Sequence, residues 1–184
     1  MIEGENNLVD KARKGNSEAF GALYDYYLPK IYRFVLFKVS HKQQAEDITQ
    51  QTFMKAWENV RTYKPQGYTF GSWLYRIARN SVIDYYRKNE PQVDIEEVSP
   101  EALGIDSSLI AKLEVKLDWE KILIAIGGLS EVEQDVLIMR FVEDLPHSDV
   151  AKAVQKSENA VKVIQHRALK KLKETLSKKW RRST

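Results

Sequence analysis

Hydrophobic residues recur along most of this chain at three- and four-residue steps, which is the period of an α-helix. Between residues 18 and 39 the recurring positions are Phe20, Leu23, Tyr24, Tyr27, Ile31, Phe34, Val35 and Val39. A second stretch runs from Ala45 to Val60, and a third, from Leu74 to Tyr85, gathers its apolar residues on one face. Strand-like alternation is rare. The pattern predicts an all-α fold.

Polar and turn-forming residues between these stretches predict where the helices begin and end. Ser40 stands three residues before Gln43, the spacing of a capping box that would start the second helix. Pro29 lies inside the first helix, where a proline can produce a kink. The segment 63–71 contains Pro65 and two glycines, so we expect a loop there.

A change in composition near residue 89 predicts a boundary between two small helical domains. Residues 89–116 lose the helical period, contain two prolines and are acidic. We therefore expect one domain at residues 1–88 and another at residues 117–184, joined by a flexible acidic linker of residues 89–116.

The second domain has the order of elements of a helix-turn-helix. Ser130 and Glu133 have the spacing of a capping box ahead of an apolar run. A short helix is predicted from Pro146 to about residue 154, then a tight turn at residues 155–156, then a long basic helix that Ser157 would cap. A short helix, a tight turn and a basic long helix are typical of DNA-binding domains.

The long basic helix has an apolar side and a polar side. The apolar side consists of Val161, Ile164, Ala168 and Leu172, and the polar side carries Asn159, Lys162, Val163, His166 and Lys170. Such a polar side suits the major groove, where side chains near the helix start reach base edges and lysines meet phosphates. A merely solvated helix would show the same two sides, and the preceding short helix and turn favour DNA recognition.

Charge is distributed unevenly, although the net charge is only +3. Residues 61–88 and 162–184 are basic, and the segment between residues 89 and 118 is acidic. The first basic block also contains the aromatic residues Tyr63, Tyr68, Phe70, Trp73, Tyr75, Tyr85 and Tyr86. Aromatic rings stack on unpaired bases while arginines follow the backbone, so this block is a candidate for binding single-stranded DNA. Phe70, Trp73 and Tyr85 could instead be core residues, an interpretation favoured for Trp73 and Tyr85, which makes the loop aromatics the stronger candidates.

The sequence favours neither a catalytic nor a membrane function. It has no cysteine, and His41, His147 and His166 lack carboxylates at metal-ligand spacing. We expect no enzymatic activity, no metal and no cofactor; a metal held by His41, Glu46 and Asp47 is the remaining catalytic alternative. The lack of cysteine fits a reducing compartment, and the polar N-terminal segment lacks the apolar core of a signal peptide. We therefore expect a cytoplasmic protein that is not inserted in a membrane.

Three segments resemble conserved regions 2 and 4 of the extracytoplasmic-function (ECF) sigma factors, of the sigma-70 superfamily, in the order found in that family. They are AEDITQQTFMKAWENV, FGSWLYRIARNSVIDYYRK and LSEVEQDVLIMRFVEDLPHSDVAKAVQKSENAVKVIQHRALKKLK. The resemblance covers about residues 8–88 and 117–176. It implies a non-enzymatic subunit that binds RNA polymerase core and directs promoter-specific initiation by recognising minus-10 and minus-35 elements.

The resemblance also implies which residues contact each partner. Core polymerase, through the clamp helices of its largest subunit, would be bound by Asp47, Gln50, Gln51 and Phe53. The minus-10 element would be recognised and melted by Tyr63, Tyr68, Phe70, Arg76, Arg79, Asn80 and Arg87. The minus-35 element would be read by Ser157, Asn159, Lys162, Val163, His166, Arg167 and Lys170. Further implied partners are the flap of the second-largest polymerase subunit and an anti-sigma factor.

The spacing of the two domains is compatible with this resemblance. Promoter elements about 25 base pairs apart lie ~85 Å apart along DNA, and a linker of residues 89–116 can reach about 90 Å. Two positions depart from the family pattern: Gln51 stands where Glu is common, and Gln155 stands where the turn commonly holds Gly. A stand-alone helix-turn-helix regulator is the main alternative. It leaves the basic aromatic block unexplained and predicts tight operator binding without polymerase.

Overall fold

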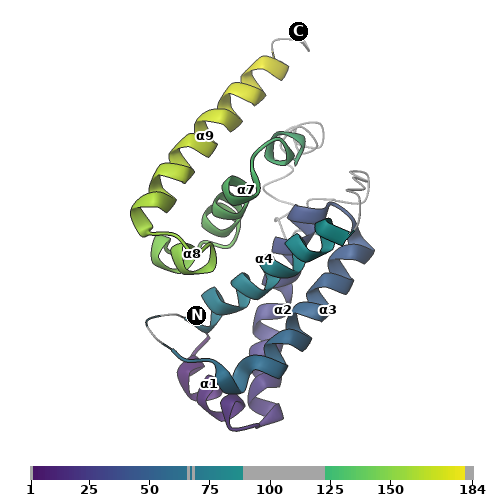
Figure 1. Cartoon of the computed structure of the whole chain (residues 1–184), viewed down its shortest axis with the longest axis vertical. Coiled ribbons are helices and arrows are strands. Elements are labelled where there is room, and N and C mark those ends of the chain that lie inside the picture. Colours follow the sequence, from purple (N-terminus) through teal and green to yellow (C-terminus); the bar gives the residue numbers. More distant parts are fainter. Residues whose placement is uncertain (1, 66, 68, 89–122, 181–184) are drawn as a thin grey trace.

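The computed structural model describes residues 2–65, 67, 69–88 and 123–180, and throughout these ranges the regular structure is helical (Figure 1). The helices form an N-terminal group, within residues 5–88, and a C-terminal group, within residues 123–180, which lie side by side. The prediction of an all-α fold is confirmed.

The N-terminal group is a small helical bundle. It consists of α1 (Glu5–Arg13), α2 (Ser17–Val39), α3 (Lys42–Asn59), the short 3-10 helix η1 (Val60–Thr62) and α4 (Phe70–Lys88). Helices α2, α3 and α4 pack against one another, and α1 packs on α2 and η1. Asn16 caps α2 by accepting a hydrogen bond from the Ala19 N–H at 2.7 Å, and α2 stays helical through Pro29.

The junction between α2 and α3 differs from the predicted capping box. Ser40 is left-handed, with φ 53°, and ends α2 by donating its N–H to the Leu36 carbonyl at 2.9 Å. The start of α3 is capped by His41, whose Nδ1 accepts a hydrogen bond from the Gln44 N–H at 3.4 Å. The capping box predicted at Ser40 and Gln43 is therefore wrong, because a capping residue needs an extended backbone.

Helix α4 begins inside the segment that was expected to be a loop. Thr69 precedes the helix, and its Oγ1 accepts a hydrogen bond from the Ser72 N–H at 3.1 Å. Gly71 faces α2 so closely that a Cβ there would lie 2.8 Å from the hydroxyl oxygen of Tyr27. That hydroxyl donates to Glu5 Oε2 at 2.9 Å in the core, so glycine at position 71 lets α4 approach α2.

The C-terminal group contains the predicted helix-turn-helix. Residues 123–127 are helical and are followed by α7 (Glu131–Leu137), a π-helical turn η3 (Ile138–Val142), α8 (His147–Ala153) and α9 (Glu158–Trp180). The capping box at Ser130 is confirmed, because its N–H donates to Glu133 Oε2 at 3.0 Å. The predicted linker of residues 89–116, and the start of the second domain at residue 117, lie outside the described residues.

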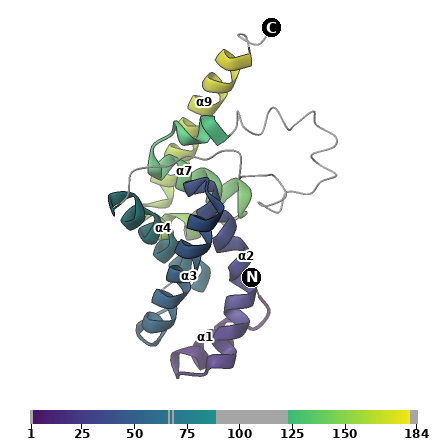
Figure 2. The same cartoon turned by 90° about the vertical axis from the view of Figure 1, so that its right-hand side faces the viewer.

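Buried apolar side chains of both groups form one contiguous core. Phe34 and Tyr75 of the N-terminal group belong to the same cluster as Ile138, Met139 and Val150 of the C-terminal group. Helix α8 packs on α4, and η3 packs on α2. In Figure 2 the C-terminal group lies against the N-terminal group. In this structure the two groups are therefore closed against one another.

Candidate nucleic-acid interface

The turn between α8 and α9 is built by local hydrogen bonds. The Lys156 N–H donates to the Ala151 carbonyl at 2.9 Å, and Ser157 Oγ accepts a hydrogen bond from the Ala160 N–H at 3.2 Å, which confirms Ser157 as the cap of α9. Gln155 is left-handed, with φ 56°. This conformation is mildly strained for a residue with a Cβ.

Helix α9 presents its predicted polar side to solvent. Val161 and Ala168 are fully buried, and Ile164 is half-buried. The seven predicted reader side chains are all exposed: Ser157, Asn159, Lys162, Val163, His166, Arg167 and Lys170. Val163, with 48% of its surface exposed among polar neighbours, could contact a thymine methyl group in a major groove.

The polar face of α4 is exposed at three predicted positions and partly covered at a fourth. Arg76, Asn80 and Arg87 are exposed, and Arg87 forms an ion pair with Asp84 at 3.3 Å. Arg79 is half-buried, and its Nε donates a hydrogen bond to Asp135 of the C-terminal group.

Two aromatic residues that were expected to contact DNA are instead in the core. Tyr63 is 5% exposed and Phe70 is 3% exposed, and their ring centroids lie 5.0 and 5.3 Å from that of Trp73. Burial raises the pKa of Tyr63 to about 12. The sequence placed both rings in an exposed loop, but mutual packing removes them from the surface. In this structure the rings of Tyr63 and Phe70 are therefore not accessible for stacking, and Tyr68 lies outside the described residues.

Other aromatic rings remain accessible on α4. Trp73, Tyr85 and Tyr86 are each half-buried. Trp73 and Tyr85 are the residues for which the sequence favours a core position over DNA contact. Half-buried rings beside exposed arginines are, however, what stacking on unpaired bases requires.

Three of the four residues predicted to bind polymerase are exposed on α3, and the fourth is buried. Asp47, Gln50 and Gln51 are exposed, whereas Phe53 is 5% exposed and packs its ring 4.7 Å from that of Tyr24. Phe53 is therefore a core residue in this structure.

Two apolar side chains on the outside of α3 were missed as surface residues. Met54 is 57% exposed and Trp57 is 39% exposed. They follow Gln50 by four and seven residues, so helical periodicity alone could have placed them on the same exposed side.

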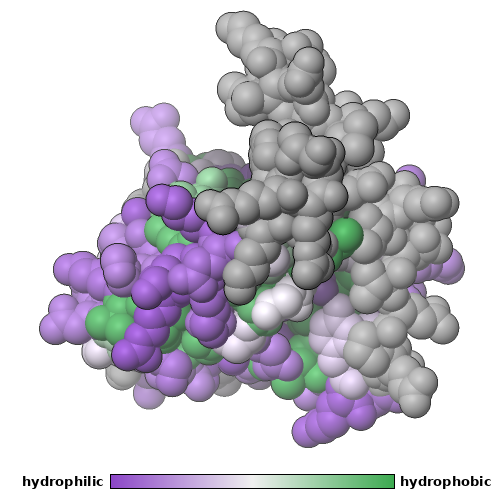
Figure 3. All heavy atoms as spheres, turned by 90° about the horizontal axis from the view of Figure 1, so that it is seen from above, coloured by the Kyte–Doolittle hydropathy of each residue, from purple (hydrophilic) through white to green (hydrophobic). Residues whose placement is uncertain are grey.

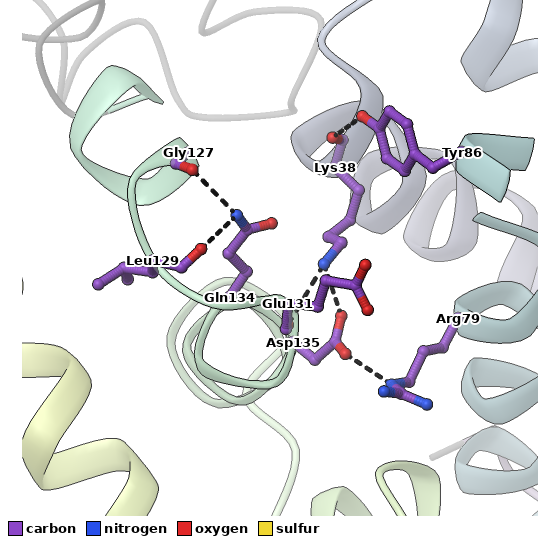
Figure 4. Close-up of polar contacts among 8 residues, drawn as sticks. All are labelled: Lys38, Arg79, Tyr86, Gly127, Leu129, Glu131, Gln134 and Asp135. Carbon is purple, nitrogen blue, oxygen red and sulfur yellow. Dashed lines mark hydrogen bonds and ion pairs between the residues drawn. The ribbon is translucent and has the colours of Figure 1, made fainter. Parts of the chain in front are cut away.

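Asp135 of α7 lies at the centre of the polar contacts between the two groups. It accepts a hydrogen bond from Arg79 Nε at 2.6 Å, and the Lys38 ammonium lies 3.0 Å from its other oxygen (Figure 4). Lys38 Nζ also donates to the Glu131 carbonyl at 3.3 Å, and its own carbonyl accepts a hydrogen bond from the Tyr86 hydroxyl at 2.6 Å. This network joins α2 and α4 to α7.

Glu143, at the end of η3, forms a second polar contact across the groups. Its two carboxylate oxygens accept hydrogen bonds from Nε and Nη2 of Arg33 at 2.6 and 3.0 Å, and the Tyr75 hydroxyl donates to it at 3.0 Å. The carboxylate raises the pKa of Arg33. Burial, reinforced by Glu143, raises the pKa of Tyr75 well above its ordinary value.

Two further contacts lie beside the start of α4 and the turn of the helix-turn-helix. Thr69 Oγ1 donates to Asp149 Oδ2 at 2.9 Å, and burial raises the pKa of Asp149. With its amide oxygen toward Arg76, Gln155 accepts hydrogen bonds from Nε and Nη2 of that arginine, each at 3.0 Å. Sequence reasoning missed all four contacts, because the partners are far apart along the chain.

Neither a metal site nor a membrane-spanning helix is found among the described residues. Hydrophobic side chains appear in the view from above as separate patches between hydrophilic ones (Figure 3). Within the described ranges, no group of three or more His, Asp or Glu side chains could hold a metal ion. No described helix has both the length and the apolar character needed to cross a bilayer.

Comparison with protein families matches both halves of the chain. Residues 23–91 match the model of Sigma-70 region 2, and residues 125–174 match the model of Sigma-70, region 4. The chain belongs to the ECF sigma factors of the sigma-70 family. The recognised resemblance is thus confirmed, and below region 2 and region 4 denote these two matched ranges.

The sigma factor is similar to several curated relatives. It is 32% identical to the ECF RNA polymerase sigma factor BldN of Streptomyces coelicolor, with 90% of this chain and 63% of BldN covered. It is 27% identical to SigW of Bacillus subtilis, with 91% of this chain and 94% of SigW covered. The chain thus spans less than two thirds of BldN and nearly all of SigW.

Solved structures of similar fold support the helical architecture of the sigma factor. CnrH, solved in complex with the cytosolic domain of CnrY, has a TM-score of 0.69 at 23% identity, with 94% of this chain and 97% of that chain covered. RpoE of Bartonella quintana, solved in complex with the anti-sigma factor NepR, has a TM-score of 0.66 at 22% identity, with 86% and 96% covered. At this identity the likeness concerns the fold.

Proposed function

We propose that this sigma factor binds core RNA polymerase and directs initiation to promoters by recognising minus-10 and minus-35 elements. One observation carries the proposal: a helix-turn-helix with all its predicted reader side chains exposed shares a chain with α4, whose polar face combines arginines and accessible aromatic rings. The polymerase would supply the chemistry, and this chain would supply promoter specificity.

The proposed minus-35 reader is α9. Lys162, Val163 and His166 near its start would face base edges, and Lys170 further along would meet phosphates. Burial of Val161 and Ala168 supports this orientation, because it fixes which side of the helix points away from the domain.

The proposed minus-10 reader is α4. Arg76, Arg79, Asn80 and Arg87 would contact the backbone and bases of the separated strand, and the half-buried rings of Trp73 and Tyr85 would replace Tyr63 and Phe70 as stacking surfaces. Stacking on an aromatic ring contributes about 1 to 3 kcal/mol per base.

The proposed polymerase contact is the outer side of α3. Asp47, Gln50 and Gln51 would bind the clamp helices of the largest subunit, and the exposed side chains of Met54 and Trp57 would add apolar area. Aromatic and methionine side chains are enriched in protein interfaces, which supports this extension. Region 4 would bind the flap of the second-largest subunit.

We also propose that an anti-sigma factor regulates the protein. The support is that RpoE of Bartonella quintana was solved with the anti-sigma factor NepR. Such a partner would cover the polymerase-binding and DNA-binding surfaces of both regions.

Run-off transcription tests the proposed function. Purified core polymerase is supplied with fragmented genomic DNA, with and without this protein. Discrete new transcripts whose start sites share two spaced upstream motifs are expected. Tight binding to DNA by the protein alone, without new transcripts, would establish the stand-alone regulator instead.

A further inference from the structure

Region 4 contacts region 2 on the surface that we propose reads the minus-10 element. Arg79 donates a hydrogen bond to Asp135, and Arg76 donates hydrogen bonds to Gln155 in the turn of the helix-turn-helix. Two arginines of the proposed reading face are therefore engaged within the chain itself.

Asp135 is buried so completely that it depends on its cationic partners. Its side chain is 1% exposed, and the Lys38 side chain beside it is 5% exposed (Figure 4). A buried carboxylate is stable when cations and hydrogen bonds replace water, and here region 2 supplies the cations. The closed arrangement is therefore specific and not an incidental contact of two exposed surfaces.

Glu143 fixes the relative orientation of the two regions at a second point. Its side chain is 1% exposed and accepts two hydrogen bonds from the planar guanidinium of Arg33. Such paired bonds have directional preference, so two separate carboxylates of region 4 hold the closed form in one orientation.

Closure competes with promoter binding for chemical and for geometric reasons. An arginine binds a carboxylate and a phosphate through the same set of N–H groups, so Asp135 occupies a position on Arg79 that a DNA phosphate would need. Promoter elements about 25 base pairs apart are separated by ~85 Å, and regions that share one core cannot contact both.

We propose that the free chain is autoinhibited by closure of region 4 on region 2, through Asp135 and Glu143. The closed form covers part of the minus-10 face of α4, leaves the minus-35 face of α9 open, and separates when core polymerase binds. The inference rests on the proposed function, because the covered face is the proposed minus-10 reader.

A reversible covalent lock tests the inference directly. The chain has no cysteine, so Thr69→Cys combined with Asp149→Cys, whose side chains touch across the regions, introduces two thiols, and loss of both free thiols on oxidation reports that the disulfide has formed. With core polymerase, the oxidised protein should lose promoter-specific transcription by roughly tenfold or more, and reduction should restore it. Thr69→Cys alone is the control and should respond to neither treatment. Equal transcription by oxidised and reduced double variants would overturn the inference.

Opening variants test the two carboxylates. Asp135→Asn with Glu143→Gln keeps side-chain size and removes both charges. The matched controls are Glu133→Gln, whose glutamate pairs with Lys171 inside region 4, and Asp144→Asn, whose aspartate is exposed. Dyes on cysteines introduced at the exposed positions Glu58 and Glu174 report the distance between the regions through energy transfer.

The opened variant should lose energy transfer and bind a random single-stranded DNA of about 20 nucleotides roughly tenfold more tightly, while the controls match the parent chain. Unchanged energy transfer and affinity in the opened variant would overturn the inference. The proposed function fails separately: if the unmodified chain yields no promoter-specific transcript, both proposals fall, whereas transcription by the locked and unlocked proteins alike removes only autoinhibition.

Discussion

Helices α4 and α9 both carry a polar, basic side opposite an apolar one, but the polar sides differ in their exposure to solvent. On α9 every predicted reader side chain is exposed, whereas on α4 Arg79 is half-buried against Asp135. The difference follows from their surroundings, because α4 packs on α2 and α3 and also on α8 of the other region. A helical wheel therefore identifies a polar face but does not establish that the face is free.

The acidic residues of α7 show the same contrast on a smaller scale. Glu133 pairs with Lys171, which is 57% exposed, and this partner lowers the pKa of Glu133. Asp135, two residues further on, pairs with Lys38 and Arg79 away from solvent. An exposed pair contributes about 0 to 1 kcal/mol, whereas breaking a buried pair costs about 3 to 5 kcal/mol.

The largest expected effect comes from breaking the buried pair. Asp135→Ala leaves Lys38 and Arg79 without their carboxylate, so the closed form should lose about 3 to 5 kcal/mol of stability. We expect urea unfolding, followed by circular dichroism, to change from one cooperative transition to two, as each region unfolds separately.

Lys171→Ala is the matched control for this experiment. It removes the exposed partner of a pair that lies within region 4, and Glu133 keeps its hydrogen bonds to Ser130, so the cost should stay within about 1 kcal/mol. A similar cost for the two variants would mean that the buried contact does not couple the regions.

Removing an exposed side chain of α4 should separate DNA reading from closure. Asn80 is exposed and makes no hydrogen bond to another described residue, so Asn80→Ala should leave closure intact. We expect promoter opening, measured by permanganate reactivity of unpaired thymines, to fall by roughly tenfold to 100-fold, as losing a base contact of about 1 to 3 kcal/mol implies. Affinity for core polymerase, measured by competition, should be unchanged. Equal losses of opening and of core binding would instead indicate misfolding.

Substitutions on α9 should affect sequence preference without disturbing region 2. Lys162→Ala or His166→Ala should change the preferred upstream sequence by about 1 to 3 kcal/mol per altered base pair. Lys170→Ala should instead weaken binding to all sequences and lower the salt dependence of binding. Selection of bound sequences from a randomised upstream element measures both effects, and an unaltered preference in Lys162→Ala would show that α9 is oriented differently.

Features encoded locally could be predicted from the sequence. The capping box at Ser130 and the cap at Ser157 each depend on a few neighbouring residues, and each is present in the structure. The buried side of α9 also followed from periodicity, because that helix packs on one side only.

Features that depend on distant parts of the chain could not be predicted in the same way. Tyr63 and Phe70 lie in or beside a segment rich in turn residues, yet the packing of the Tyr63 ring against Phe70 at the start of α4 buries both rings. The partners of Asp135 and Glu143, which are Arg79 and Arg33, lie 56 and 110 positions away along the chain. Which residue covers another is decided by the approach of two domains, and no local pattern encodes it.

Gln155 combines a local backbone feature with a contact to a distant residue. Its substitution should have the smallest effect on stability and on closure. Its left-handed backbone is strained, and its amide bonds Arg76 across the regions. Gln155→Gly should relieve about 1 kcal/mol of strain while removing the bond, whereas Gln155→Ala removes the bond and keeps the strain. Energy transfer between the regions should fall slightly and equally in both variants, but thermal stability should be higher in the glycine variant. If the two variants melt at the same temperature, the turn carries no strain. The contact with Arg76 would then be the remaining structural reason for glutamine, rather than glycine, at position 155.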